Sequence, residues 1–255
     1  MGILDLFSLK GKNALVTGSG QGLGAGMAIA LAQAGANVAL HSFSHKVLDE
    51  TIAEIEKTGV KYITVSGDVG DKPTALGFVD ATVKAFGSID ILVNNAGTIR
   101  RAPAVEHSEE FWQTVINTNL NSVWYLSQYA GKLMIAQGHG KIINTASLLS
   151  FQGGITVPSY AAAKGGVAQL TKALANEWAS KGIQVNAIAP GYFATDNTKA
   201  LRADPVRSEA ILGRIPAGQW GLPSDLAGAA VFLASEASNY VNGHILVVDG
   251  GWLCR

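Results

Sequence analysis

Cysteine, charge and long apolar runs are all scarce in this sequence, and each shortage excludes a class of protein. Cys254 is the only cysteine, so no disulfide can form within the chain and a reducing compartment is expected. Charged residues make up 15% of the chain, and Lys+Arg and Asp+Glu balance at 19 each, which leaves no basic field for nucleic acid. No apolar run approaches the ~18 residues of a membrane span. We therefore expect a cytoplasmic protein with no nucleic-acid or membrane partner.

Apolar residues account for 48% of the 255 residues, enough to fill the core of one large domain. From residue 13 onward, short apolar runs alternate with stretches of helical spacing. Strands are expected at 13–18, 37–41, 62–68, 89–97, 141–147, 183–191 and 244–250. Helices are expected at 22–34, 46–57, 73–86, 108–136, 160–179 and 225–234. This alternation predicts a single α/β domain over 1–255, with a doubly wound parallel sheet of about seven strands and helices on both faces.

A glycine-rich turn follows the first expected strand and opens the first expected helix. Residues 17–24 read TGSGQGLG. Glycines let a backbone turn sharply, and a helix N-terminus offers free N–H groups and a positive dipole end to a pyrophosphate. A tight turn without a ligand is the alternative interpretation. Gly22, Gly24 and Gly26 all fall at or inside the helix start, where glycine costs stability, and this favours phosphate binding.

A serine, a tyrosine and a lysine form a second pattern. Ser147 ends an apolar run, Tyr160 lies thirteen residues later, and Lys164 lies four beyond that. Positions i and i+4 share one helix face, and open α/β sheets place their sites at the carboxyl ends of strands. A nearby ammonium favours a phenolate, so we expect Lys164 to lower the pKa of Tyr160 and make it a proton acceptor or donor. Because Y-x-x-x-K recurs by chance in helices, this interpretation depends on the rest of the chain.

These motifs, in this order, resemble the classical short-chain dehydrogenase/reductases. The similarity covers nearly the whole chain and includes T-G-x-x-x-G-x-G at 17–24, Asp68–Val69, N-N-A-G at 94–97, Asn119, Ser147, Tyr160, Lys164, and Pro190–Gly191 followed by Thr195. The resemblance implies a Rossmann-type fold that binds a nicotinamide dinucleotide. It also implies that Tyr160 is the acid/base, that Ser147 binds the substrate oxygen, that Lys164 holds the nicotinamide ribose, and that Asn119 anchors a water.

The resemblance implies a cofactor-binding set of Gly18, Ser19, Gly20, Gly22, Leu23, Gly24, Ser42, Asp68, Val69, Asn95, Ala96, Gly97, Tyr160, Lys164, Pro190, Gly191 and Thr195. Ser42 stands where an acidic residue would bind the ribose of NAD and a basic one the 2′-phosphate of NADP. The lack of an adjacent cation favours NAD, whereas His45 and Lys46, a few residues on, leave NADP open. The five histidines do not cluster with acids or with the cysteine, so no metal site is expected.

Stretches outside the catalytic set are similar to the sugar-acid dehydrogenases of this family, among them TIRRAP, SLLSFQGGITVPSY and VDGGWLCR. They imply hydride exchange at C5 of a keto-sugar acid of the 2-dehydro-3-deoxy-D-gluconate type, with gluconate, another keto acid, a steroid or an acyl-carrier-protein ketone as alternatives. A carboxylate suits a guanidinium, which can bind both of its oxygens. The substrate-binding candidates are Ser147, Tyr160, Arg100, Arg101, Gln152 and Arg202, with Arg207 and Arg214 in the same stretch as Arg202.

Residues 192–222 are poor strand material, and at most one short helix, 205–213, fits their periodicity. A connection of this length in a compact domain is usually functional, so we expect a substrate lid.

The expected helices 108–136 and 160–179 are apolar on more than one face and need a partner, and the resemblance implies a homotetramer. A non-catalytic nucleotide-binding regulator on the same fold is the alternative function, although it has no need for Ser147, Tyr160 and Lys164 together.

Overall fold

The computed structural model describes residues 2–44 and 49–255. Its strands are β1 Asn13–Val16, β2 Asn37–Ser42, β3 Tyr62–Ser66, β4 Ile91–Asn94, β5 Gly140–Thr145, β6 Ile183–Pro190 and β7 Ile245–Val248. They form one sheet in the order β3-β2-β1-β4-β5-β6-β7, and every neighbouring pair is parallel. The strand order reverses direction between β1 and β4, which is where sheets of this type bind ligands.

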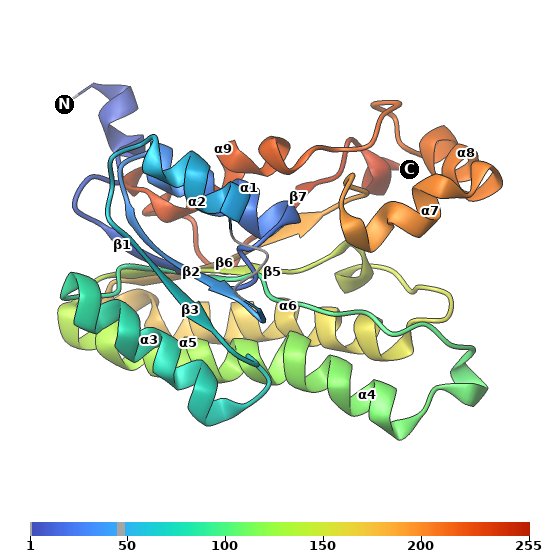
Figure 1. The fold of residues 1–255 in the computed structure, drawn as a ribbon, viewed down its shortest axis with the longest axis horizontal. Helices are drawn as coiled ribbons and strands as arrows, with labels where there is room; N and C mark the ends of the chain where they lie inside the picture. The colour runs from blue at the N-terminus through green and yellow to red at the C-terminus, as the bar shows by residue number, and fades with distance from the viewer. Residues whose placement is uncertain (1, 45–48) are drawn as a thin grey trace.

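Helices cover both faces of the sheet (Figure 1). They are α1 Gly22–Gln33, α2 Asp49–Glu56, α3 Lys72–Phe86, α4 Glu109–Ile116, α5 Ser122–Gln137, α6 Pro158–Trp178, α7 Lys199–Ala203, α8 Pro205–Arg214 and α9 Ala227–Ala234. One face carries α1, α2 and α9, and the other carries α3, α4, α5 and α6. The prediction of a doubly wound parallel sheet of about seven strands is confirmed.

Each face of the sheet has its own apolar core because successive strand residues point to opposite sides. In β1, Ala14 and Val16 face the core under α1 and α9, whereas Leu15 faces the core under α3, α5 and α6. All four residues of β1 are buried, as are all four of β4. Continuous burial explains why these strands read as unbroken apolar runs in the sequence.

Two expected helices differ from the structure. The helix expected at 108–136 is interrupted by a π-helical turn, Asn117–Asn121, between α4 and α5. The helix expected at 46–57 corresponds to α2, which begins at Asp49, and residues 46–48 lie outside the described residues. The first difference bears on Asn119, which lies inside the π-helical turn.

The expected lid segment, 192–222, is more regular than the sequence predicts. Besides α8, which matches the expected helix at 205–213, it contains the short helix α7. Its two ends meet: the Ala194 N–H donates to the Gly221 carbonyl at 2.8 Å, and the Gly221 N–H donates to the Tyr192 carbonyl at 3.0 Å. Figure 1 shows α7 and α8 beyond the carboxyl ends of the strands, beside the C-terminus of the chain.

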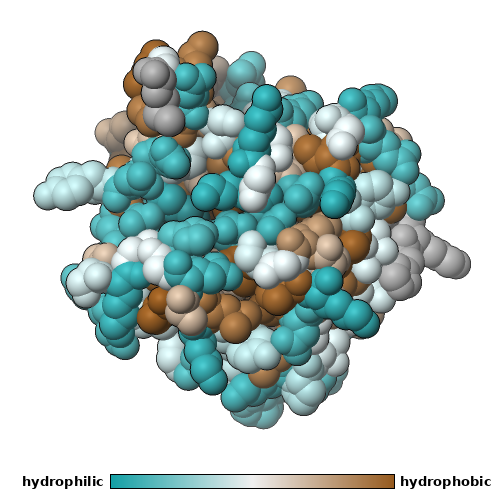
Figure 2. Space-filling view, turned by 90° about the vertical axis from the view of Figure 1, so that its left-hand side faces the viewer, coloured by the Kyte–Doolittle hydropathy of each residue, from teal (hydrophilic) through white to brown (hydrophobic). Residues whose placement is uncertain are grey.

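The opposite end of the molecule is seen in Figure 2, which views the left-hand side of Figure 1. A band of hydrophobic side chains crosses the lower half of a mostly hydrophilic face. Among the described residues, no helix is both long enough and apolar enough to cross a membrane.

Two helical glycines provide a matched test of the packing. A Cβ at Gly24 in α1 would lie 2.1 Å from the Gly18 carbonyl oxygen, whereas one at Gly77 in α3 would meet nothing within 4 Å. Gly77→Ala is expected to raise the free energy of unfolding by about 0.5–1 kcal/mol, because alanine has less backbone freedom to lose. Gly24→Ala is expected to lower it by about 1–3 kcal/mol through overpacking. Urea denaturation measures both, and equal effects would contradict the packing described.

Candidate active site

The glycine-rich turn between β1 and α1 fits a phosphate group closely. Gly18 has φ +65°, a backbone conformation that favours glycine, and a Cβ there would lie 2.9 Å from the Ala96 Cα. The N-cap residue of α1, Gln21, makes no side-chain cap bond to the helix. The N-terminal N–H groups of α1 therefore have no side-chain cap, and the glycines before them let a ligand come close to the backbone. An anion site requires both features.

Thr17 and Asn95 fix this turn to the loop that follows β4. The Thr17 hydroxyl donates to the Val93 carbonyl at 3.2 Å and accepts from the backbone N–H groups of Asn95, at 2.9 Å, and Ala96, at 3.1 Å. The Asn95 amide donates in return to the carbonyls of Thr17, at 3.0 Å, and Gly18, at 3.1 Å. Asn95 thus shapes the phosphate turn through its side chain.

The other predicted cofactor residues lie along the same edge of the sheet. Ser42 ends β2, Asp68 and Val69 follow β3, Gly97 follows β4, and Pro190 ends β6. Thr195 lies against the start of α1, because a Cβ at Gly22 would be 3.5 Å from the Thr195 Cγ2. The structure therefore brings the predicted cofactor-binding set to one edge, with Leu23 partly buried on the adjoining turn of α1.

Ser147, Tyr160 and Lys164 meet at this edge. Ser147 follows β5, and Tyr160 and Lys164 lie one turn apart on α6. The Lys164 Nζ lies 5.6 Å from the centroid of the Tyr160 ring and donates to the Thr145 carbonyl at 2.5 Å. The lysine is 3% exposed, and burial lowers its pKa to about 8. It still carries most of its charge at neutral pH.

The expectation that Lys164 lowers the pKa of Tyr160 is wrong for the ligand-free protein. Burial raises the pKa of the Tyr160 phenol, while a hydrogen bond with Ser147 and the positive charge of Arg101 lower it by less. The lysine ammonium lies over the face of the ring and donates a hydrogen bond to the Thr145 carbonyl. It therefore does little to stabilise a negative charge on the phenol oxygen. The phenol therefore keeps its proton at neutral pH.

Asn119 is fully buried in the π-helical turn, and its side chain is committed to the backbone of Thr98. Its Oδ1 accepts from the Thr98 N–H at 2.8 Å, and its Nδ2 donates to the Thr98 carbonyl at 2.9 Å. A π-helical turn inside an α-helix is frequent at functional sites. Here it places Asn119 where it fixes the loop that leads to Arg100 and Arg101.

The candidate substrate residues occupy different positions around the site. The Arg100 guanidinium donates to the Thr98 hydroxyl at 2.9 Å, and Arg202 donates to the Thr195 carbonyl at 3.2 Å. Gln152 accepts a hydrogen bond of 3.4 Å from Arg214, whose guanidinium stacks 4.1 Å from the Trp252 ring centroid. Arg101 is exposed and acts on the phenol of Tyr160 through its charge.

Sequence reasoning missed His41 and Trp252. The His41 ring is buried between the glycine-rich turn and the loop after β3, and a lone histidine ending an apolar strand was the only signal. Trp252 packs with Leu148, Ile211 and Ile215 in a small apolar cluster that joins the C-terminus to the lid segment. Across residues 2–44 and 49–255, no three His, Cys, Asp or Glu side chains gather as metal ligands would.

Known proteins are similar to this chain over nearly its whole length. The family model described as enoyl-(acyl carrier protein) reductase matches residues 18–253. The 2-dehydro-3-deoxy-D-gluconate 5-dehydrogenase of Bacillus subtilis is 58% identical, and the alignment covers 100% of both chains. The protein of that name from Escherichia coli is 56% identical over 99% of this chain and 100% of its own.

A crystal structure gives the same result at the level of the fold. Gluconate 5-dehydrogenase from Burkholderia cenocepacia, in complex with NADP and tartrate, superposes with a TM-score of 0.94, at 41% identity and with 100% of both chains covered. Matches of this extent leave no segment of the chain outside the comparison. The chain belongs to the short-chain dehydrogenase/reductase family.

Proposed function

We propose that the protein exchanges a hydride between a nicotinamide dinucleotide and C5 of a keto-sugar acid of the 2-dehydro-3-deoxy-D-gluconate type. The observation that carries this proposal is the meeting of Ser147, Tyr160 and Lys164 beside an uncapped, glycine-lined helix N-terminus. Curated relatives that are more than half identical along their full length bear that activity in their names. A regulator that only binds nucleotide has no use for a buried lysine beneath a tyrosine.

The bound nicotinamide supplies the hydride chemistry, and the residues of this chain handle the proton and the geometry. Tyr160 holds its proton in the free protein, so it is ready to donate to the oxygen of a C5 ketone during reduction. Ser147, hydrogen-bonded to Tyr160, holds that oxygen in line. In the oxidation direction Tyr160 must first lose its proton, and the hydrogen bond with Ser147 and the positive charge of Arg101 both lower the pKa of the phenol and favour that loss.

Tyr160→Phe tests the acid/base assignment. The variant keeps the ring over Lys164 and removes only the hydroxyl, so dinucleotide binding is expected to stay within about threefold of the wild type. Turnover of 2-dehydro-3-deoxy-D-gluconate or its 5-keto product is expected to fall by at least ~10²-fold, as for other removed acid/base groups. Steady-state rates and fluorescence titration with the reduced dinucleotide measure the two effects. Activity close to that of the wild type would show that another group moves the proton.

Arg101 is the arginine that we propose binds the substrate carboxylate. Arg100 and Arg202 each donate to a nearby backbone carbonyl or hydroxyl, whereas the charge of Arg101 reaches the Tyr160 phenol. A hydrogen bond of 3.0 Å from the Ala102 N–H to the Thr156 carbonyl ties the Arg101 loop to the segment before α6. Thr156 has φ +64°, and among the described residues no other non-glycine residue has a positive φ. Strain of this kind concentrates at functional sites.

Arg101→Gln is expected to raise KM for the sugar acid by about 10- to 100-fold, because a hydrogen bond to a charged group contributes about 1.5–3 kcal/mol. Arg207→Gln is the control, since Arg207 is an exposed arginine of α8 whose side chain makes no hydrogen bond or ion pair within residues 2–44 and 49–255. Initial rates at varied substrate give KM and kcat for both. If the two variants behave alike, the carboxylate binds elsewhere, and Arg202 or the Arg214–Gln152 pair takes its place.

For the choice of dinucleotide we propose that both NAD and NADP bind. The Ser42 hydroxyl at the end of β2 accepts from the Ser44 N–H at 3.0 Å, and no carboxylate stands at that position to repel a 2′-phosphate. His45 and Lys46, which leave NADP open in the sequence, lie outside the described residues. The relative from Burkholderia cenocepacia is in complex with NADP. Titration with NADH and with NADPH measures the preference.

We also propose that residues 192–222 form a lid that closes over bound substrate. The segment leaves and rejoins the sheet at one point, Tyr192–Ala194 with Gly221, so it can move as a unit. Leu148, next to Ser147, packs against Ile211, Ile215 and Trp252, which couples the segment to the catalytic serine. Slower hydrogen exchange across 192–222 on addition of substrate would support closure, and unchanged exchange would contradict it.

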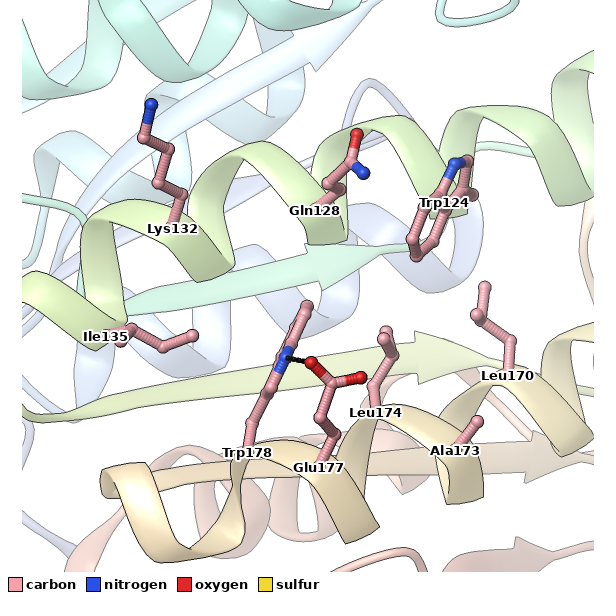
Figure 3. A pocket seen from close by; sticks show the side chains of 9 residues that line it. All are labelled: Trp124, Gln128, Lys132, Ile135, Leu170, Ala173, Leu174, Glu177 and Trp178. Carbon is pink, nitrogen blue, oxygen red and sulfur yellow. Dashed lines mark hydrogen bonds between the residues drawn. The ribbon is translucent and has the colours of Figure 1, made fainter.

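A groove between α5 and α6 supports the proposal of a homotetramer (Figure 3). Its volume is about 480 Å³, and it is lined by Trp124, Gln128, Lys132, Ile135, Leu170, Ala173, Leu174, Glu177 and Trp178. Trp124, at one edge of the groove, is 38% exposed. The Trp178 Nε1 donates to the Glu177 carboxylate at 3.3 Å, and Trp178 itself is 7% exposed where it lines the groove. The same pair of helices in a second copy would cover this apolar surface.

Trp124→Lys tests this interface. A lysine buried between subunits carries an unpaired charge, so the variant is expected to scatter light as a smaller species than the wild type, whose mass is expected to be four times that of one chain. Trp112→Lys on α4 is the matched control, because Trp112 is 37% exposed and lies outside the groove. A wild-type protein with the mass of one chain at micromolar concentration would refute the tetramer.

A further inference from the structure

His41 is a buried titratable group for which the proposed mechanism has no use. It lies in β2 next to the strand end and is 2% exposed. Its ring packs on Phe78 of α3, with the centroids 4.6 Å apart. A histidine held this tightly next to a ligand-binding turn has a fixed orientation, so the partners of its two ring nitrogens determine which form it adopts.

The two nitrogens bind two loops that come from opposite sides of β2. The Nδ1 accepts from the Gly18 backbone N–H at 3.0 Å, and the Nε2 lies 3.0 Å from the Gly67 carbonyl. A backbone N–H can only donate and a carbonyl can only accept. The ring therefore carries its proton on Nε2 and is neutral, since no other form satisfies both partners.

The glycine-rich turn is held on this side by His41 alone among the described side chains that reach Gly18 N. On the other side Gly18 is confined by Ala96, because even a methyl group there would come within 2.9 Å of the Ala96 Cα. The His41 backbone adds three hydrogen bonds to Ser19: the His41 N–H donates to the Ser19 hydroxyl at 2.9 Å, and the His41 carbonyl accepts from the Ser19 N–H at 2.8 Å and from the Ser19 hydroxyl at 3.3 Å. The turn is thus gripped between β2 and the loop after β4.

Protonation of the His41 ring would break the hydrogen bond between Nδ1 and the Gly18 N–H. A second N–H would then face the Gly18 N–H, donor against donor, inside a site closed to water. The charged group facing the ring is Asp68, in the loop after β3, which favours the protonated form. The turn of residues 17–21 and helix α1 carry no charged residue, and α3 presents Phe78. Burial lowers the pKa of His41 below its ordinary value, because it outweighs the hydrogen bond to the Gly67 carbonyl and the charge of Asp68, both of which raise it.

We propose that His41, in its neutral form, is the positioning residue that sets the glycine-rich turn for the phosphates of the cofactor, so that acid releases the dinucleotide by protonating the ring. The inference rests on the proposed function, because it takes the turn to be the dinucleotide site. It adds a residue outside the catalytic set and a direction of pH dependence.

The first test is the dissociation constant of NADPH and of NADH for the full chain, measured by fluorescence titration from pH 8.5 to pH 5. For the wild type it is expected to be constant above pH 7 and then to rise, with a limiting slope of about one decade per pH unit, as expected when one proton opposes binding. Tighter binding in acid would mean that the phosphates attract a protonated ring and would overturn the proposal. So would a flat profile.

Variants of His41 distinguish the hydrogen-bond acceptor at Nδ1 from the positive charge of the protonated ring. His41→Asn places an amide oxygen near the position of Nδ1, so it is expected to bind within about threefold of the wild type at pH 8 and to show no pH dependence. His41→Leu leaves the Gly18 N–H unpaired, so it is expected to bind at least about tenfold more weakly at every pH. His139→Asn is the control, because His139 pairs with Asp90 at 2.8 Å, away from the turn, and its profile should follow the wild type. A leucine variant that binds like the wild type would overturn the proposal.

A second readout needs no cofactor. The pKa of an unfolded histidine is about 6.5, and that of folded His41 is lower. Below pH 6.5 the unfolded chain then binds more protons, so the stability due to this group, present above pH 6.5, is lost as the pH falls. Urea unfolding of the free chain should show this loss for the wild type and a smaller one for His41→Asn. Identical pH dependences would overturn the proposal. Failure of the wild type to bind dinucleotide at any pH would instead refute the proposed function.

Discussion

The hydroxyl of Thr17 joins the two loops on which the site depends. It donates to β4 and accepts from two consecutive N–H groups after β4, at the point where the order of the strands changes direction. A parallel sheet opens a crevice at such a point because the loops on either side leave in opposite directions. Thr17 and Asn95 join the two loops below this crevice with five hydrogen bonds of 2.9–3.2 Å, which fix the base of the glycine-rich turn. The remaining site residues project over that base from β5, α6 and β6.

Burial decides the electrostatics of the catalytic group. Two groups of opposite type, a phenol and an ammonium, lie together on α6, and both are pushed toward their neutral forms. Burial disfavours any charge, and the lysine ammonium lies over the face of the tyrosine ring rather than next to its oxygen. At neutral pH the free protein therefore holds a neutral phenol beside an ammonium whose pKa, about 8, is only a little above neutrality. Electrostatic effects gain strength in such a setting because little solvent screens them.

Local patterns predicted the parts of this structure that depend on local sequence. Short apolar runs located all seven strands, because strands covered by helices on both faces are rich in apolar residues. The π-helical turn at Asn119 did not follow from the sequence, because Thr98, which binds the asparagine side chain, is 21 residues away. The raised pKa of Tyr160 was also missed, because spacing reveals that Lys164 is near but says nothing of how deeply both are buried. His41 contacts residues 18 and 67, and such three-way contacts leave no periodic trace. Helix α7 has five residues, too few to show a helical pattern.

The closed base of the 192–222 segment has a consequence for how this architecture diversifies. Because Tyr192–Ala194 and Gly221 are hydrogen-bonded to one another, the segment leaves and rejoins the sheet at one place, and it also contacts Leu148, Gln152 and the C-terminal residues. Residues can be added to or removed from such a segment at low entropic cost, because closing a longer loop is only slightly harder than closing a shorter one. The contacts that tie β1, β4 and α6 together would remain in place. Exchange of this one module between homologues is therefore a route by which evolution, or an engineer, can redirect the scaffold to new hydroxy acids.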